Sequence, residues 1–147
     1  TYAAAQDRAV GVRAALGDAG LELVGDVLFS EWSEHWGRDA SALLLSQHPD
    51  IDGIFCASDQ IARGALDTLR DLGKRVPEDI AVIGYDNWEV LATNSRPELT
   101  SIDANLQQLG RAAAMRIFEA IDGEAPDAVV DHLPVRLVIR GSTIPRR

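Results

Sequence analysis

The sequence is poor in the residues that build disulfides and metal centres. It contains one cysteine, Cys56, and three widely separated histidines, His35, His48 and His132. A single cysteine cannot form a disulfide within the chain, and the histidines show none of the spacings typical of zinc ligands. The sequence therefore predicts no internal disulfide, no metal site and no cofactor. A reducing compartment, the cytoplasm, fits this cysteine usage.

Basic residues and long apolar runs are also scarce. Lysine and arginine number 14 against 23 acidic residues, which gives a formal net charge of −9. This balance argues against the chain holding a nucleic-acid backbone by itself, because phosphate binding needs clustered Lys and Arg. No apolar run is long enough for a membrane helix, so no membrane partner is expected. There is no initiating Met and no leader pattern, so we expect Thr1 to be an internal residue of a longer protein.

The signatures of common enzyme classes are missing as well. The chain has no Gly-rich phosphate loop, no nucleophile elbow and no cluster of metal ligands. A phospho-receiver domain would need paired acids after its first strand, and the segment GDVLFSEWSEH has no adjacent pair. We therefore expect a binding protein and no catalytic residues.

Alternating helices and strands dominate what is present. The length of 147 residues, with 46% hydrophobic and 25% charged residues, suits one globular domain. Apolar periodicity predicts strands at 21–29, 51–57, 80–85 and 99–103, an extended segment at 129–140, and helices near 5–19, 33–48, 60–72, 88–93 and 106–121. Such alternation predicts an α/β fold, a three-layer parallel sheet with right-handed crossovers.

Local signals define several ends of these elements. Ser33 is placed to cap the second helix, and Asn105 with Gln108 three residues later resembles a capping box. Gly73 follows the helix 60–72 as its C-terminal stop. Pro134 within the last extended segment indicates an edge strand or a crossover.

Polar and aromatic residues follow the first three predicted strands. Trp32 comes after the first strand, Ser58 and Asp59 after the second, and Asp86 after the third. If these strands are parallel, the four residues share the rim where open α/β sheets bind ligands. Carboxylates bind neighbouring hydroxyls and Trp covers the apolar face of a sugar ring, so the pattern predicts a polyhydroxylated ligand. Arg8 on the first helix would add a charged fork.

Each of these residues also has a structural interpretation. Asp59 or Ser58 would serve as the cap of the helix 60–72, since both types are favoured at that position. Asp86 would be a turn residue, Trp32 a packing residue at a loop, and Arg8 a solvated helix charge.

The chain resembles the effector-binding core of the lactose-repressor (LacI-type) family of bacterial transcription regulators. Five segments carry the resemblance in the expected order: DRAVGVRAAL (7–16), ASDQIARGAL (57–66), VPEDIAVIGYDN (76–87), RPELTSI (96–102) and LPVRLVIRGST (133–143). By this resemblance Arg8 and Asp86 match the arginine and aspartate that contact effector. Trp32 matches an aromatic residue placed against the ligand, and Ser58 and Asp59 belong to the same ligand segment.

The resemblance implies a particular domain organisation. Residues 1–147 would be the C-terminal portion of the effector domain and would resemble one lobe of a periplasmic binding protein. The helix-turn-helix headpiece, which would contact operator DNA, and the N-terminal lobe lie outside this chain. A small-molecule effector, a sugar or sugar derivative, would change DNA affinity. A homodimer is expected, with its surface on helix 60–72 and around 88–97. In the family the helix 106–121 packs on the other lobe, so in this chain we expect it either to fold back onto its own sheet or to pack on a neighbouring chain.

Two points leave the function open at this stage. Many family members carry a glutamine that reaches the ligand at the position of Ala104, so the effector itself is not defined. A periplasmic sugar-binding protein of a transport system shares the fold and would use the same rim. A signal peptide upstream would indicate transport, and a helix-turn-helix would indicate regulation.

Overall fold

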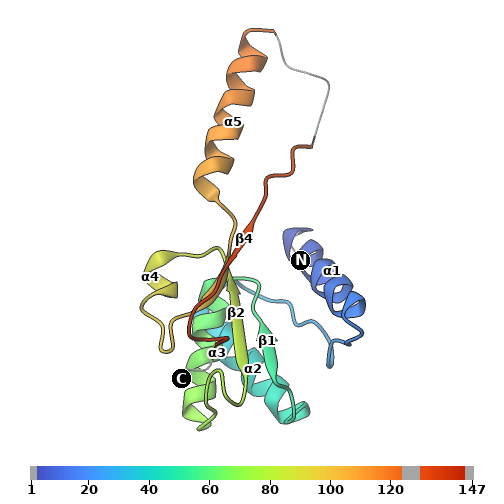
Figure 1. The fold of residues 1–147 in the computed structure, drawn as a ribbon, viewed down its shortest axis with the longest axis vertical. Helices are drawn as coiled ribbons and strands as arrows, with labels where there is room; N and C mark the ends of the chain where they lie inside the picture. The colour runs from blue at the N-terminus through green and yellow to red at the C-terminus, as the bar shows by residue number, and fades with distance from the viewer. Residues whose placement is uncertain (1–2, 124–129, 145–147) are drawn as a thin grey trace.

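The computed structural model describes residues 3–123 and 130–144. Figure 1 shows the path of the chain. The elements in order are α1 (Ala3–Asp18), α2 (Glu34–Gln47), β1 (Gly53–Phe55), α3 (Asp59–Asp71), β2 (Ala81–Tyr85), α4 (Glu89–Ala92), β3 (Thr100–Asp103), α5 (Leu106–Ile121) and β4 (Arg136–Val138). The predicted alternation of helices and strands is confirmed, and α5 has the predicted bounds.

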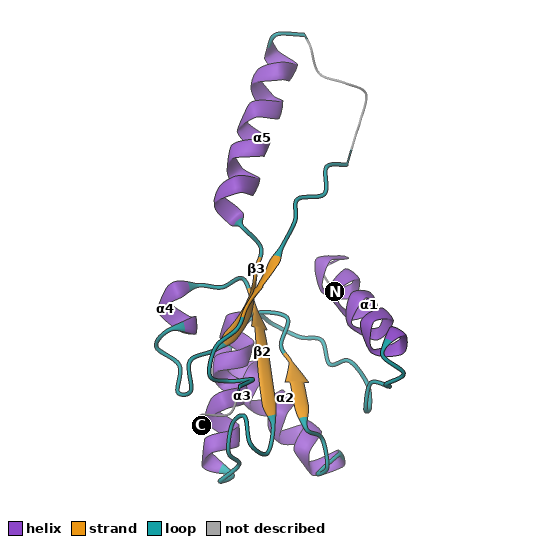
Figure 2. Ribbon diagram, viewed as in Figure 1, coloured by secondary structure: helices purple, strands orange, loops and turns teal. Residues whose placement is uncertain are grey.

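The strands form one sheet in the order β1-β2-β3-β4. β1, β2 and β3 run parallel, with Ile54 opposite Val82 and Ile83 opposite Thr100. β4 is antiparallel to β3 and lies at the edge of the sheet, where Pro134 indicated an edge strand. The α/β class is therefore confirmed, with a mostly parallel sheet flanked by helices (Figure 2).

The core lies between the sheet and the helices α2 and α3. Its buried residues include Ile54, Ala62, Leu66, Leu69, Ile80, Val82 and Leu99. Two glycines let α2 and α3 approach closely: a Cβ on Gly37 would collide with the carbonyl of Ile61, and one on Gly64 with the carbonyl of Glu34. Close backbone packing of this kind fixes α3, whose first turn lies at the carboxyl ends of the parallel strands.

The helix α5 contrasts with this core because none of its residues is buried. It projects away from the sheet in Figure 1, beyond the ends of β3 and β4. Its large apolar side chains are exposed: Leu106, Leu109, Met115, Ile117, Phe118 and Ile121. The expectation that this helix folds back onto its own sheet was therefore wrong within the described residues, and its packing on a neighbouring chain stays a prediction.

Three expectations about local structure were wrong or only partly met. Residues 21–29 do not form a strand; Gly25 has φ +70°, a value outside the β region, and within the described residues no strand pairs with this segment. Asn105 precedes α5 with φ +49° and bonds the side chain of Gln108 instead of capping the backbone. Of the extended segment 129–140, only Arg136–Val138 is strand, and Val129 lies outside the described residues.

Other signals at helix ends are confirmed. The Ser33 hydroxyl accepts a hydrogen bond from the Trp36 amide at 3.0 Å and caps α2. Gly73 has φ +69° directly after the C-cap of α3, the backbone geometry for which glycine is favoured.

Candidate ligand-binding site

Arg8 connects the helix α1 with the carboxyl ends of the parallel strands, here called the rim. Its Nη1 donates to the carbonyl oxygen of Ala57, just past β1, at 2.7 Å. Its guanidinium lies 3.7 Å from the ring centroid of Tyr85 and 5.5 Å from that of Trp32. Stacking between two aromatic rings stabilises a cation and fixes the direction of its donors. The structure therefore brings Arg8 and Trp32 together as predicted.

Asp86 stands at the same rim, directly after β2. Its backbone is held in an unusual conformation, φ +103°, and its amide donates to the carbonyl of Ile102 at 2.9 Å. Burial raises the pKa of the Asp86 carboxyl, the positive charge of Arg8 lowers it, and the negative charge of Asp59 raises it further. Such a half-buried carboxylate can accept charge-assisted hydrogen bonds from hydroxyl groups, and its perturbed pKa marks it as a candidate functional residue.

Asp59 is a buried anchor for the chain that carries Asp86. The side chain is only 1% exposed. Its carboxylate accepts from the Trp88 amide at 2.7 Å and from the Ser101 hydroxyl at 2.6 Å. Burial raises its pKa, and the two hydrogen bonds and the charge of Arg140 oppose that rise. The absence of a side chain on Gly84 makes room for this carboxylate, since a Cβ there would collide with it.

The interpretation of Asp59 as the cap of α3 was wrong, because Ser58 has that role. The Ser58 hydroxyl accepts from the Ile61 amide at 3.2 Å. Both Ser58 and Asp59 are buried beneath the rim. Direct contact of either residue with a ligand stays a prediction.

Arg140 supports the same turn and was not found from the sequence. Its Nη2 donates to the side-chain oxygen of Asn87 and its Nη1 to the carbonyl of Leu99, each at 2.8 Å. The backbone amide of Asn87 in turn donates to the Ser101 hydroxyl at 3.0 Å. The partners of this network lie 14 to 53 residues apart, so spacing along the chain gave no signal for it. Tyr85 was also missed, although its place at the end of β2 could have indicated it.

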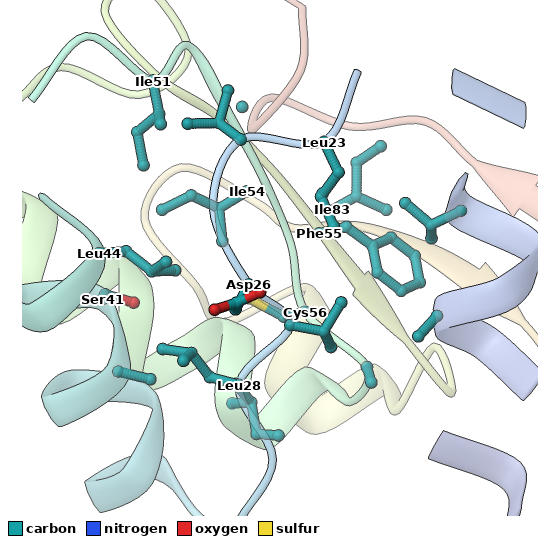
Figure 3. Close-up of a pocket in the computed structure, with 18 of the residues that line it drawn as sticks. Leu23, Asp26, Leu28, Ser41, Leu44, Ile51, Ile54, Phe55, Cys56 and Ile83 are labelled. Carbon is teal, nitrogen blue, oxygen red and sulfur yellow. The ribbon is translucent and has the colours of Figure 1, made fainter. Parts of the chain in front are cut away.

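A cavity of about 780 Å³ lies below the rim, between α1, the segment 22–30 and β1. Figure 3 shows the side chains that face it, among them Leu23, Leu28, Ile54 and Phe55. Arg8 and Trp32 line its rim end. Most of the lining is apolar, which distinguishes it from the charged cluster above.

The described residues contain no group of three or more His, Cys, Asp or Glu side chains arranged to hold a metal ion. In the same part of the chain no helix has both the length and the apolar composition needed to cross a bilayer.

Comparison with known proteins defines the family. Residues 1–143 match the model of the periplasmic binding protein-like domain. The chain belongs to this family. The chain is 36% identical to the transcriptional regulator CelR of Thermobifida fusca over 137 residues. The matched region covers 92% of this chain and 40% of that relative. The relatives and structural neighbours are LacI-type transcriptional regulators, which confirms the resemblance found in the sequence.

Two solved structures show the same likeness in three dimensions. The chain matches a complex of CelR with cellobiose at a TM-score of 0.83 and 37% identity, covering 90% of this chain and 40% of that one. It matches a Lac repressor dimer bound to operator and an anti-inducer at a TM-score of 0.85 and 29% identity, covering 96% and 42%. The chain thus spans about two-fifths of the length of these relatives.

Proposed function

We propose that this chain is the C-terminal portion of the effector-sensing domain of a LacI-type transcriptional regulator. The observation that supports this most strongly is the cluster of Arg8, Trp32, Tyr85 and Asp86 at the rim of the parallel strands. In open α/β sheets ligands bind outside the carboxyl ends of the strands, where this cluster lies.

The proposed effector is a sugar or a sugar derivative. The carboxylate of Asp86 would accept hydrogen bonds from neighbouring hydroxyls, and the guanidinium of Arg8 would donate to ring or hydroxyl oxygens. Trp32 would cover the apolar C–H face of the ring. Ser58 and Asp59 lie buried beneath the strand ends, and we propose that they belong to the ligand-binding segment as well. CelR, with its structure in complex with cellobiose, makes cellobiose a natural first probe.

The full-length protein would couple effector binding to DNA affinity. A headpiece outside this chain would contact operator DNA, which fits the net charge of −9 on this portion. A ligand bound between two lobes alters DNA affinity if it favours one lobe arrangement over the other. The protein would act in the cytoplasm by binding and not by catalysis.

A homodimer is proposed for the full-length protein, with its surface on α3 and the segment around 88–97. This surface carries exposed apolar side chains, with Leu72 56%, Trp88 50% and Val90 75% exposed. The neighbouring Lac repressor structure is a dimer. A transport protein with the same fold is less well supported, because the relatives that match are transcriptional regulators and repressors.

The test uses the full-length protein and a panel of mono- and disaccharides that includes cellobiose. Thermal-shift screening identifies a binding sugar, and a gel shift on the regulator's own promoter region then measures operator affinity with and without it. We expect at least one sugar to raise the melting temperature and to change operator affinity. Arg8→Ala should abolish both effects, whereas Arg13→Ala, a control on the exposed side of the same helix, should keep them. Operator affinity that no panel sugar changes would contradict the proposal.

A further inference from the structure

The turn that carries Asp86 has an unusual backbone. Asp86 and Asn87 directly follow β2 with φ values of +103° and +53°, so two successive residues with side chains adopt a region that such residues rarely occupy. A backbone of this kind persists only where the surrounding structure holds it. The contacts that hold this turn therefore decide where the Asp86 carboxylate points.

The Asp86 carboxylate is placed by its backbone. The raised pKa of this carboxyl is caused by burial, which the charge of Arg8 opposes and that of Asp59 reinforces, and no hydrogen bond is among its causes. Within the described residues its oxygens are therefore available to accept hydrogen bonds from a ligand. The backbone amide of Asp86, which donates to the carbonyl of Ile102 at 2.9 Å, fixes only the start of the turn.

Asn87 fixes the rest of the turn through a side-chain amide that joins two groups of opposite kind. Its oxygen accepts from Nη2 of Arg140 at 2.8 Å, and its side chain also forms a hydrogen bond with the carboxylate of Asp103. An arginine side chain only donates hydrogen bonds, and an ionised carboxylate only accepts them. Because the Asn87 amide contains one acceptor and one donating group, its two partners set its orientation. Asparagine also tolerates a positive φ better than most residues.

Both partners of Asn87 are themselves held by other parts of the sheet. Nη1 of Arg140 donates to the carbonyl of Leu99 at 2.8 Å, just before β3. The carboxylate of Asp103, at the end of β3, accepts from Nη2 of Arg136 on β4 at 2.9 Å. The Asn87 side chain thus connects the turn after β2 with groups that β3 and β4 hold in place.

We infer that Asn87 is a positioning residue of the effector site: its side-chain amide, held between Arg140 and Asp103, fixes the left-handed turn that directs the Asp86 carboxylate toward the ligand. This role rests on the proposed function, because Asn87 acts on the effector only through Asp86. A turn residue that merely stabilised the fold would affect sugar binding to the same extent whether or not Asp86 carried its charge.

A double-mutant cycle in the full-length protein separates these two roles. Asn87→Gly keeps the positive φ accessible but removes the amide, and Asp86→Asn removes the charge through which Asn87 acts. Calorimetry with the panel sugar that gives the largest thermal shift measures the affinity of the unsubstituted protein, both single variants and the double variant. Thermal shift at rising sugar concentration covers the weak binders. We expect Asn87→Gly to lower affinity about fivefold or more beside Asp86, and less than about twofold in the Asp86→Asn background.

Asn105→Gly is the matched control. Asn105 also has a positive φ, +49°, and its side chain bonds that of Gln108 at the start of α5. The same substitution there should leave sugar affinity unchanged. Three results would overturn the inference: unchanged affinity in Asn87→Gly, an equal loss with Asp86 and with Asp86→Asn, and an equal loss in the control variant.

Hydrogen exchange without any sugar tests the hold on the turn separately from the proposed function. In the full-length protein the amides of 86–88 should be protected, and Asn87→Gly should speed their exchange about 10-fold or more, whereas Asn105→Gly should leave it unchanged. Equal exchange of 86–88 in the unsubstituted protein and in Asn87→Gly would overturn the inference even if a sugar binds. If no panel sugar binds the unsubstituted protein, the proposed function fails, and the effector role of Asn87 fails with it.

Discussion

The layer built from α2, α3 and the parallel strands differs sharply from the arm formed by α5 and β4. In the first, side chains such as Leu69, Ile80 and Leu99 are fully buried, and helices approach to backbone contact. In the arm, α5 has no buried residue, and its ion pairs, such as Arg116 with Asp131, are exposed. Both regions are regular in structure, and β4 pairs with β3, but only the layer contributes residues to the buried core.

This difference separates what the chain can stabilise alone from what depends on other parts of the protein. An isolated helix of 16 residues is only marginally stable in water, because helical stability in proteins comes mostly from packing of the apolar face. The arm therefore requires a cover that the described residues do not supply. The layer, by contrast, fixes the rim residues through long-range hydrogen bonds that all lie within the chain.

The largest expected contrast comes from adding one methyl group to a glycine in each region. Gly64→Ala places a Cβ against the carbonyl of Glu34, so we expect a loss of stability of about 3 kcal/mol or more. On α5, a Cβ at Gly110 meets nothing within 4 Å, and Gly110→Ala should stabilise by roughly 0.5–1 kcal/mol. Urea denaturation followed by circular dichroism measures both. Similar effects of the same sign would show that the two regions are not packed as described.

A smaller difference in stability between the layer and the arm is expected from Asp59→Asn, a substitution in the layer. The new amide group would face the Trp88 amide or the Ser101 hydroxyl, and one donor would lose its acceptor in a buried site. We expect a cost of roughly 1–3 kcal/mol in the free energy of unfolding. Asp131→Asn on the arm is the matched control, since it alters an exposed pair and should have little effect. Equal costs for the two variants would contradict the role given to Asp59.

The same variant should change how stability depends on pH. Burial raises the pKa of Asp59 in the folded state, so the folded state holds this proton more tightly than the unfolded state. Its stabilising contribution is present below the unfolded pKa of about 4 and is lost as the pH rises through the raised folded pKa. The cost of Asp59→Asn should therefore be largest near pH 4 and smaller at neutral pH. Denaturation curves at several pH values check this, and a cost that grows toward neutral pH would contradict it.

The smallest expected effect concerns the unsubstituted protein, in which hydrogen exchange compares the stability of α5 with that of α3. In the chain 1–147, the amides of α5 should exchange at least roughly 100-fold faster than those of α3, because α5 opens without disrupting the core. In the full-length protein the gap should shrink as the apolar stripe gains its cover. Hydrogen exchange by mass spectrometry on both proteins tests this. Equal protection of α5 in both would show that the helix needs no cover.

The sequence predicted those features that depend on local patterns. Apolar runs located β1, β2 and β3, and the signals at Asn105 and Gly123 gave the bounds of α5. Asp86 lies at the rim because it follows β2, as predicted, whereas Trp32 lies there although the strand expected before it does not form. The strand at 21–29 was wrong because a strand needs a pairing partner as well as a pattern.

The network beneath the rim could not be predicted from the sequence. Asp59 contacts Ser101, 42 residues away, and Arg140 contacts Asn87, 53 residues away. Nothing in the spacing of these residues indicates that they meet, because the contacts arise only once the sheet has formed. Tyr85 was missed for a different reason, since aromatic residues at strand ends are common packing residues.

The central claim, that the rim cluster binds a polyhydroxylated effector, is tested most directly by isothermal titration calorimetry on the full-length protein. The titrant is the panel sugar that gives the largest thermal shift, and the variants are Arg8→Ala and Asp86→Ala, with Arg13→Ala as control. Removing one charged partner from a largely buried site typically costs about 2–5 kcal/mol. We therefore expect affinity to fall more than about tenfold in both rim variants and to stay unchanged in the control. Affinity equal to that of the unsubstituted protein in both rim variants would contradict the account.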